Sequence, residues 1–267
     1  MKQRALVTVM AALLATACST SPTGRNQLIL MDDNEVATLG LQSFATLEKQ
    51  EKISQDRKAT RYVRCVAEAI VKEIPPRYMS SPHDWKVVLF DSKEVNAFAL
   101  PGSRIGIYTG IFKAARNQDQ LAAVIGHEIS HVLARHANER MSQSQLAGVG
   151  LAVADSALQG TSYQQPAMAA LGLGTQVGVL LPYGREQETE ADVLGLELMA
   201  SAGFRPQQAL DLWRNMESVS SGNKPPELLS THPSDEHRLQ RLQEQLATVE
   251  PLYDKARSLG RKPQCQS

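Results

Sequence analysis

The sequence has little of what marks several common classes of protein. It contains only three cysteines in 267 residues, which are too few for a disulfide-rich scaffold. Neither sign of charge is in excess, because 28 lysines and arginines are matched by 28 aspartates and glutamates. This balance excludes a basic nucleic-acid-binding protein and a polybasic membrane-surface protein. The chain is nevertheless long enough to bury a core in one large globular domain.

The N-terminal region lacks a hydrophobic run long enough to cross a membrane. Ala5–Ala17 is uncharged and mostly apolar, but its thirteen residues fall short of the about 20 that a spanning helix needs. Because Lys2 and Arg4 precede it, the run is typical of a signal peptide. We therefore predict that residues 1–17 are removed on export, which leaves 26 basic against 28 acidic residues.

Cys18 stands where a lipoprotein signal peptide places its lipidated cysteine. Ala15-Thr16-Ala17 precedes it, although Leu14 lies one residue further from the cysteine than is usual. We predict that Cys18 carries lipid and that residues 18–30 form a lipidated, flexible tether. Ser19 after the cysteine favours the outer membrane, with the protein facing the periplasm. The alternative is a plain periplasmic protein cleaved after Ala17.

Two further cysteines remain, Cys65 and Cys265. In an oxidising compartment these two cysteines could form a disulfide, which would link the C-terminal tail to an early helix. Two unpaired thiols, with Cys65 buried on a helix face, are the alternative. The sequence does not give the distance that decides between them.

The spacing of apolar residues predicts a mainly α-helical protein with one small sheet. Helices are expected over residues 33–53, 60–73, 119–141, 185–202 and 206–219, near residue 111, and starting at 231–233; strands are expected over 85–90 and 104–108. Residues 156–184 contain no charged side chain, which predicts a small-residue hairpin in the core, a mobile cover or a membrane-touching segment. We expect one domain over 31–250 and a C-terminal tail over 251–267.

The strongest chemical signal is the H-E-x-x-H motif formed by His127, Glu128 and His131. Histidines four residues apart project from one helix face and can bind one tetrahedral Zn²⁺. The residues around the motif are largely apolar, so the helix is expected to be buried and its histidines to need partners. In this motif the glutamate acts as a general base. The motif therefore predicts a zinc site.

A catalytic zinc needs a third protein ligand. His136 is expected about half a turn from the metal-binding face, and so is not a ligand. Glu188 and Asp192 share a helix face, so one could bind the metal while the other orients a ligand histidine. Spacing alone does not choose between them. Glu186 and Glu190 lie on other faces and are expected to be solvated.

With this second motif, E-x-x-x-D, the sequence resembles the HtpX/BepA/LoiP-like zinc metallopeptidases, gluzincins related to the CAAX prenyl endopeptidase, and in particular the LoiP-type outer-membrane lipoproteins. The resemblance covers most of the chain, including residues 21–24, 96–102, 108–110 and 231–233. It implies an α+β, mainly α, gluzincin-type fold with a small β-sheet packed on the helices that carry the motifs. It also implies that Glu188 is the ligand and Asp192 its supporting partner.

The resemblance implies a metalloendopeptidase with one Zn²⁺ per chain and Glu128 as the base that deprotonates water. His232 is the leading candidate for a second catalytic residue, a donor that stabilises the oxyanion. It could instead be a regulatory fourth ligand or cap the following helix. Arg238 is a weaker candidate, which could point inward or to solvent.

The expected substrates are misfolded or unassembled envelope proteins, bound in extended form along residues 104–108. Gly106 would leave room for the second backbone, or would simply pack inside the sheet. The alternative function is a chaperone-like assembly factor with a self-inhibited zinc site, whose partners could include the outer-membrane assembly machinery. The predicted partners are unfolded or misassembled protein substrates and, through the lipid, the membrane, with the outer-membrane assembly machinery as a further candidate and no nucleic acid.

Overall fold

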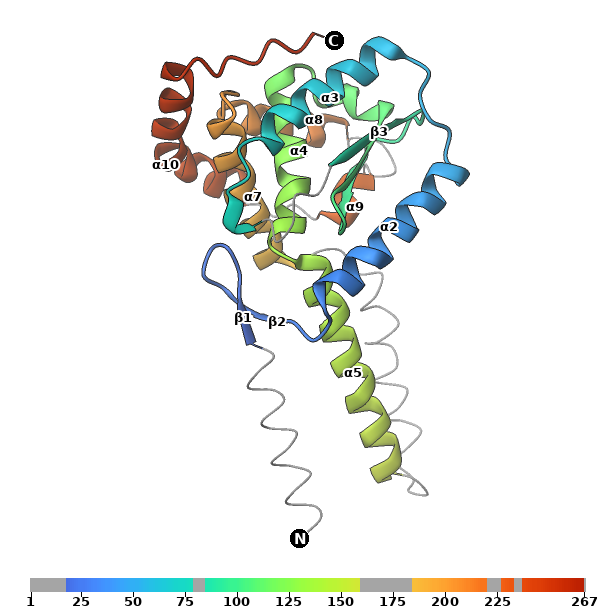
Figure 1. The fold of residues 1–267 in the computed structure, drawn as a ribbon. Helices are drawn as coiled ribbons and strands as arrows, with labels where there is room; N and C mark the ends of the chain where they lie inside the picture. The colour runs from blue at the N-terminus through green and yellow to red at the C-terminus, as the bar shows by residue number, and fades with distance from the viewer. Residues whose placement is uncertain (1–17, 79–84, 159–183, 220–226, 233–236, 267) are drawn as a thin grey trace. The chain divides into compact units, whose positions relative to one another are not determined.

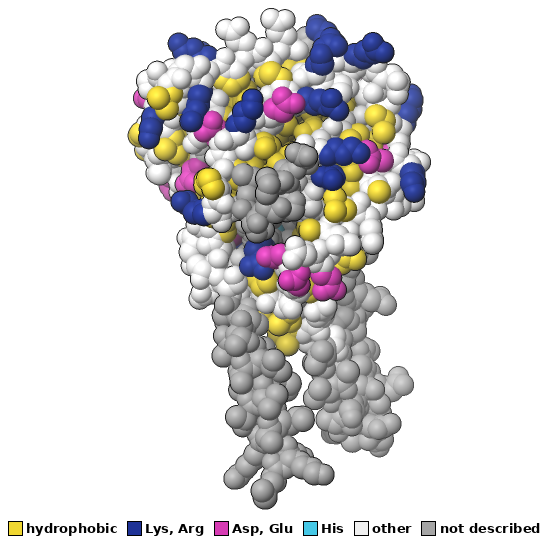
Figure 2. Space-filling model, in the orientation of Figure 1, with side chains coloured by type: hydrophobic (Ala, Val, Ile, Leu, Met, Phe, Trp, Pro, Cys, Tyr) yellow, Lys and Arg dark blue, Asp and Glu magenta, His cyan; other side chains and the backbone are white. Residues whose placement is uncertain are grey.

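The computed structural model describes residues 18–78, 85–158, 184–219, 227–232 and 237–266. The predicted signal peptide and most of the uncharged segment 156–184 lie outside the described residues. By its internal contacts the chain divides into two compact units, one formed by Met1–Val36 and Arg135–Leu181, the other by Ala37–Ala134 and Pro182–Ser267. No helix of the described part is long and apolar enough to span a membrane. On the face shown in Figure 2, basic, acidic and apolar side chains are intermixed.

The larger unit contains a three-stranded sheet. Its strands are β3 (Lys86–Phe90), β4 (Ala97–Leu100) and β5 (Arg104–Tyr108), in the order β3-β5-β4. Strands β3 and β5 are parallel, whereas β4 and β5 are antiparallel. The strand predicted to bind an extended substrate, β5, is therefore the central strand, whose two edges are both paired. The prediction that a substrate binds along β5 is therefore wrong. Strand β4, which the sequence did not indicate, is an edge strand.

The two faces of the sheet pack against different helices. On one face, Phe44 of α2 (Asp33–Gln50) meets Phe90 and Tyr108 in an aromatic cluster. The other face, which includes Ile105 and Ile107, joins the main core with α3 (Arg57–Val71). A Cβ at Gly106 would overlap the ring of Phe98 on β4, so this glycine is a packing residue.

Two helices in the middle of the larger unit pack very closely (Figure 1). They are α4 (Gln118–Leu133), which follows the 3₁₀ turn η2 (Thr109–Lys113), and α7 (Arg185–Ser201). A Cβ on Gly126 of α4 would lie 2.9 Å from the carbonyl oxygen of Gly195 on α7. The glycine pair thus allows the two backbones to approach at this point.

The helix predicted over 119–141 is broken. It ends at Leu133, and Arg135 adopts a left-handed conformation with φ 57 before α5 (His136–Leu158) begins. The spacing of apolar residues continues across the break, so it does not predict where α4 ends. The break coincides with the boundary between the two units.

The remaining elements described in the larger unit are helices. They are the short turn η1 (Pro76–Tyr78), α8 (Gln208–Val219), α9 (Glu227–Thr231) and α10 (Arg238–Ser258). Thr231 ends α9, so the helix start predicted at 231–233 is wrong for that residue. The tail boundary predicted at residue 250 falls inside α10, which continues through Pro251. The prediction of a mainly α-helical protein with a small sheet is confirmed.

The C-terminal tail is attached to the larger unit by a disulfide between Cys65 of α3 and Cys265. The structure thus shows the paired form of the two alternatives. The side chain of Gln118, at the start of α4, accepts a hydrogen bond of 2.8 Å from the backbone N–H of Cys265 and donates one of 3.0 Å to the carbonyl of Pro263. These contacts hold the tail against the N-terminal end of α4.

The smaller unit contains the residues expected to be a flexible tether. Strands β1 (Cys18–Thr20) and β2 (Asn26–Leu28) instead form an antiparallel hairpin. Arg25 makes two hydrogen bonds of 2.7 Å to the buried carboxylate of Glu139 on α5. A bidentate pair of this kind fixes the hairpin on the helix, so a free tether is the wrong description of residues 18–30.

Candidate metal centre

Helix α4 supplies the first two side chains of the site. Its buried sequence around the H-E-x-x-H motif packs against α3, α7 and α8, and places His127 and His131 on one face. Their Nε2 atoms lie 3.1 Å apart. Two ring nitrogens that face each other at this distance must share a proton or bind a common cation.

Helix α7 supplies two carboxylates, which take different positions. The Oε2 and Oε1 atoms of Glu188 each lie 3.4 Å from an Nε2 atom, the first of His127 and the second of His131. Asp192 contacts the far side of the His127 ring, with its Oδ1 3.0 Å from Nδ1. Glu188 is therefore placed as a donor beside the two histidines, and Asp192 as the residue that orients one of them.

The neighbouring acids of α7 differ from one another. Glu186 is exposed, as expected, but Glu190 is buried. The expectation that both are solvated is wrong for Glu190, because α7 is enclosed by its neighbours over more than one face.

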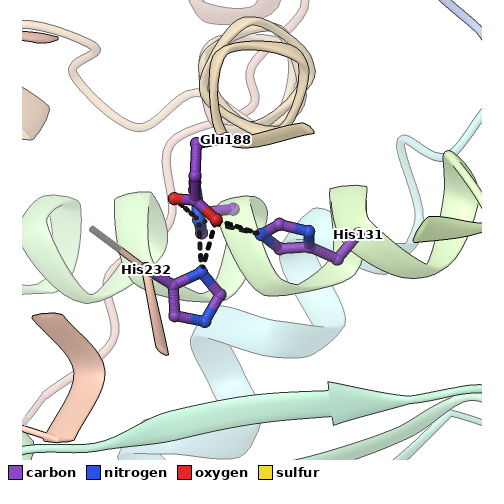
Figure 3. Close-up of side chains that lie close together, drawn as sticks. His131, Glu188 and His232 are labelled. Carbon is purple, nitrogen blue, oxygen red and sulfur yellow. Dashed lines mark hydrogen bonds and ion pairs between the residues drawn. The ribbon is translucent and has the colours of Figure 1, made fainter. Parts of the chain in front are cut away.

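His232, which directly follows α9, is the fourth side chain of the cluster. Its Nδ1 lies 2.9 Å from Oε1 of Glu188 and 3.2 Å from Nε2 of His127. Figure 3 shows His131, Glu188 and His232 converging from three separate segments. His232 is buried among these side chains. This position is compatible with a hydrogen-bond donor to the oxyanion and with a fourth metal ligand, and it does not favour a helix cap.

Glu128 is buried next to the cluster and has one carboxylate oxygen available. Its Oε1 accepts no hydrogen bond from the residues that the structure describes, and lies 3.5 Å from Nε2 of His232. The backbone N–H of Ala99, on the edge strand β4, hydrogen-bonds to the carboxylate. Burial raises the pKa of Glu128, although the charges of His232 and His127 act against it. A carboxylate with a raised pKa and a free oxygen is suited to accept a proton.

The pKa values of the two histidines of α4 are shifted in opposite directions. Burial lowers the pKa of His127, but the carboxylates of Glu188 and Asp192 outweigh it and raise the pKa to about 9. Burial holds the pKa of His131 well below its usual value. Burial would raise the pKa of Asp192, but the charge of Arg238 and the hydrogen bond from His127 keep it low. In the metal-free protein, the carboxylates therefore favour the protonated form of His127, whereas burial disfavours that of His131.

These residues fit a metal ion. His127, His131, Glu188 and His232 each offer one donor atom, and the four atoms lie within 4.8 Å of one another. Glu188 Oε2 is buried and lies 3.1 Å from Nη1 of Arg238, yet it accepts no hydrogen bond from the described part of the chain, which is rare for a buried oxygen. A cation among the four atoms would satisfy it. Three imidazole nitrogens and one carboxylate are ligands that zinc prefers, so the cluster could hold this metal.

Two residues complete the surroundings of the cluster. Arg238 points inward, is 2% exposed and forms ion pairs with Asp192 and Glu188. Trp213 of α8 was not foreseen from the sequence. Its ring centre lies 6.1 Å from that of His127 and 3.5 Å from Cζ of Arg238. A single tryptophan in an amphipathic helix carries no signal that would distinguish it from any other core residue.

The remaining predicted residues lie elsewhere. His136 is buried in α5 and is not part of the four-residue donor cluster. Cys18 lies in β1, and its lipidation stays a prediction.

Comparison with known proteins agrees with this geometry. The sequence profile of peptidase family M48 matches residues 57–246. The mitochondrial metalloendopeptidase OMA1 of Schizosaccharomyces pombe is 33% identical over 163 residues, which cover 61% of this chain and 47% of that protein. The beta-barrel assembly-enhancing protease of Escherichia coli K12 is 33% identical over 189 residues, 64% of this chain and 38% of that protein.

A second beta-barrel assembly-enhancing protease, from Yersinia pestis, is 27% identical over 284 residues, 96% of this chain and 58% of that protein. The chain thus spans less than two thirds of the length of each of these three relatives. All four residues of the donor cluster fall within the matched profile. The resemblance seen in the motifs is confirmed: the chain belongs to peptidase family M48.

Proposed function

We propose that the protein is a zinc-dependent endopeptidase. The observation that carries this proposal is the position of Glu128 beside a cluster of four metal-donor atoms. This carboxylate is buried, and its Oε1 accepts no hydrogen bond from the described residues. A site that only stored metal or stabilised the fold would have no use for such a group. The named relatives include metalloendopeptidases, which supports the same reaction for this chain.

His127, His131 and Glu188 would hold the metal, and Asp192 would keep the His127 ring in place. Bound zinc supplies Lewis acidity, which makes a water molecule acidic near neutral pH and polarises the scissile carbonyl. Glu128 accepts the proton of the attacking water at Oε1 and delivers it to the leaving amine. Its raised pKa brings it closer to neutral pH, where it can both take and return a proton.

Strand β4 is the surface that we propose for an extended substrate. One edge of β4 pairs with β5, and no strand of the described part pairs with the other edge. The contact between the Ala99 N–H and Glu128 places β4 directly beside the proposed base. A polypeptide that adds to this edge must be extended, so unfolded or misassembled proteins are the proposed substrates.

We further propose that these substrates are envelope proteins and that Cys18 anchors the enzyme by lipid to the outer membrane, facing the periplasm. The signal-like sequence of residues 1–17 supports export. The printed name of the Escherichia coli relative supports a link to β-barrel assembly. Labelling with radioactive palmitate tests the anchor, because a Cys18→Ala variant should lose both the label and membrane association. A labelled Cys18→Ala protein would contradict it.

The central test is the Glu128→Gln variant, assayed on an unfolded protein with its zinc content measured. We expect zinc to remain bound and cleavage to fall to background, because the amide cannot accept the proton. The exposed Glu186→Gln is the matched control and should cleave normally. If Glu128→Gln binds zinc and cleaves as the wild type does, the proposed function is wrong.

A chaperone-like assembly factor is the second candidate, supported by one observation. His232 Nδ1 lies among the metal donors, where it could close the site in the resting state. Complementation of a strain that lacks the gene separates the two functions. An assembly defect that Glu128→Gln repairs as well as the wild type does would favour the chaperone-like function.

A further inference from the structure

Arg238, the first residue of α10, is a buried charge next to the proposed metal ligands. The side chain is 2% exposed, and a guanidinium is costly to bury unless its N–H groups find acceptors. Neither the H-E-x-x-H motif nor the E-x-x-x-D motif includes it. Its burial therefore needs an explanation from its contacts.

One guanidinium contacts two carboxylates of α7, those of Asp192 and Glu188. Nε and Nη2 of Arg238 donate hydrogen bonds of 2.8 Å each to the two oxygens of Asp192. The remaining nitrogen, Nη1, lies 3.1 Å from Oε2 of Glu188. This planar, two-pronged arrangement fixes the rotation of the Asp192 carboxylate and restricts that of Glu188.

The guanidinium is itself held in place. Its Cζ lies 3.5 Å from the centre of the Trp213 ring on α8, a distance at which the charge interacts with the ring face. The indole thus supports one side of Arg238, while Asp192 accepts hydrogen bonds from two of its nitrogens and Glu188 forms an ion pair with the third. Helices α7, α8 and α10 together set its position.

The effect on the metal ligands passes through Asp192. Its Oδ1 accepts one hydrogen bond from Nη2 of Arg238 and also lies 3.0 Å from Nδ1 of His127. Because that contact orients the imidazole, Nε2 of His127 is turned toward His131 and Glu188. A change at Arg238 would therefore loosen both Glu188 and the His127 ring.

The charge of Arg238 also balances the site. Glu128, Glu188 and Asp192 bring three buried carboxylates together. A divalent cation compensates two negative charges, and Arg238 compensates the third. Without it, one carboxylate would be left buried without compensation in the metal-bound protein.

We propose that Arg238 is a positioning residue, which fixes Glu188 and, through Asp192, His127 in the geometry that binds the metal. The proposal rests on the metal site of the proposed function. It assigns to the start of α10 a part in metal binding.

The test measures metal binding directly. Wild type, Arg238→Met and Arg238→Lys are stripped of metal, and their affinities for Zn²⁺ and Co²⁺ are measured by competition with a chromophoric chelator. Arg238→Met is expected to lose about 10- to 100-fold in affinity, the usual effect of removing a group that supports a ligand. Arg238→Lys keeps the positive charge but cannot form the two-pronged hydrogen bond to Asp192, so it should lose less affinity than Arg238→Met. The Co²⁺ absorption bands should shift in both variants.

Two further variants make the result specific. The exposed Arg214→Met, which removes a surface ion pair with Asp211, should keep wild-type affinity and spectrum. If Arg238 acts largely through Asp192, the double variant Asp192→Asn/Arg238→Met should lose less affinity than the two single losses combined. Full additivity would contradict the path through Asp192.

Wild-type affinity and an unchanged Co²⁺ spectrum in Arg238→Met would overturn the proposal. If circular dichroism shows that this variant does not fold, the same comparison is made with Arg238→Lys, for which wild-type affinity and an unchanged Co²⁺ spectrum would overturn the proposal. The result is independent of peptidase activity. If Glu128→Gln still cleaves, the proposed function is wrong, but a loss of metal affinity in Arg238→Met would still support the positioning role. If Arg238→Met keeps wild-type affinity, the positioning role is wrong, but the proposed peptidase function is unaffected.

Discussion

Gly126 of α4 and Gly195 of α7 face each other so closely that a Cβ on Gly195 would lie 2.9 Å from the backbone nitrogen of His127. Side chains of ordinary size at these positions would push the two helices apart. The two helices carry His127 and His131 on one side and Glu188 on the other. The glycine pair therefore sets the distance between the two halves of the metal site.

A Gly195→Ala substitution is expected to destabilise the protein and weaken metal binding together. The added methyl group meets backbone atoms of Gly126 and His127, which cannot move without shifting α4, so we expect a loss of about 1–3 kcal/mol in the free energy of unfolding. Gly148→Ala is the control, because no atom of the described residues lies within 4 Å of the Cβ position of that helical glycine. It should be neutral or gain up to about 1 kcal/mol from helix propensity. Urea unfolding and zinc titration measure both effects, and equal behaviour of the two variants would contradict the prediction.

Substitution of Glu188 separates a metal ligand from a residue that orients one. Glu188→Ala is expected to lose zinc, because it removes the carboxylate that faces both Nε2 atoms. Asp192→Asn should bind zinc about 10- to 100-fold more weakly without losing it altogether, since it alters only the support of His127. Zinc content after dialysis against a weak chelator measures the difference. Full occupancy in Glu188→Ala would move the ligand role to another carboxylate of α7.

The local part of the site could be predicted from the sequence, because it depends on spacing within one helix. His127 and His131 are one turn apart in any α-helix, and their neighbours indicate burial. The face shared by Glu188 and Asp192 follows in the same way. The choice between these two does not, since it depends on how α7 packs on α4, and only the family resemblance pointed to Glu188.

Features that depend on contacts between distant segments could not be predicted from the sequence, because they too are set by how the elements pack. Trp213 meets Arg238 only after their helices have packed, so Trp213 carries no local signal. The place of Arg238 near a helix start made it a candidate, but the sequence left open whether it points inward or to solvent. The break at Arg135 depends on a single left-handed residue, and the apolar pattern continues across it. The strand order that makes β4 the edge is set by pairing between segments, which the alternation along β5 does not encode.

In the metal-free protein, stability should fall as the pH rises from about 6.5 to about 9. The carboxylates of Glu188 and Asp192 outweigh the effect of burial and raise the pKa of His127 from 6.5 to about 9. A raised pKa in the folded state stabilises it fully below the unfolded value, and this contribution is lost as the pH passes through the folded value. Urea unfolding in EDTA across this range measures the fall. Asp192→Asn, which removes one cause of the raised pKa, should show a smaller pH dependence.

Zinc affinity should change in the opposite sense over the same range. His127 must lose its proton before Nε2 can bind a metal, so affinity is expected to rise with pH until about 9. Calorimetric titration in buffers of different ionisation enthalpy would show a proton released on binding. An affinity that is flat between pH 6.5 and 9, with no proton released, would contradict this assignment.

Removal of the His232 imidazole is expected to raise peptidase activity and weaken zinc binding. Its Nδ1 lies within 3.2 Å of both His127 Nε2 and Glu188 Oε1, a position among the donors. A fourth ligand at this position would compete with water and substrate, so His232→Ala should open the site. A fall in turnover of about 100-fold with zinc affinity unchanged would instead identify His232 as an oxyanion donor.

The disulfide between Cys65 and Cys265 is expected to stabilise the protein without a direct effect on the metal. It closes a loop with a sequence separation of 200 residues, and such a link restricts the unfolded chain, so the Cys65→Ser/Cys265→Ser variant should lose about 2–4 kcal/mol. Gln118→Ala removes the hydrogen bonds of the tail but keeps the covalent link, and should lose only about 1 kcal/mol. Dithiothreitol should lower the unfolding midpoint of the wild type to that of the double variant and leave the latter unchanged. A wild type that is insensitive to the reductant would show that the tail contacts, and not the covalent link, hold this end of the chain.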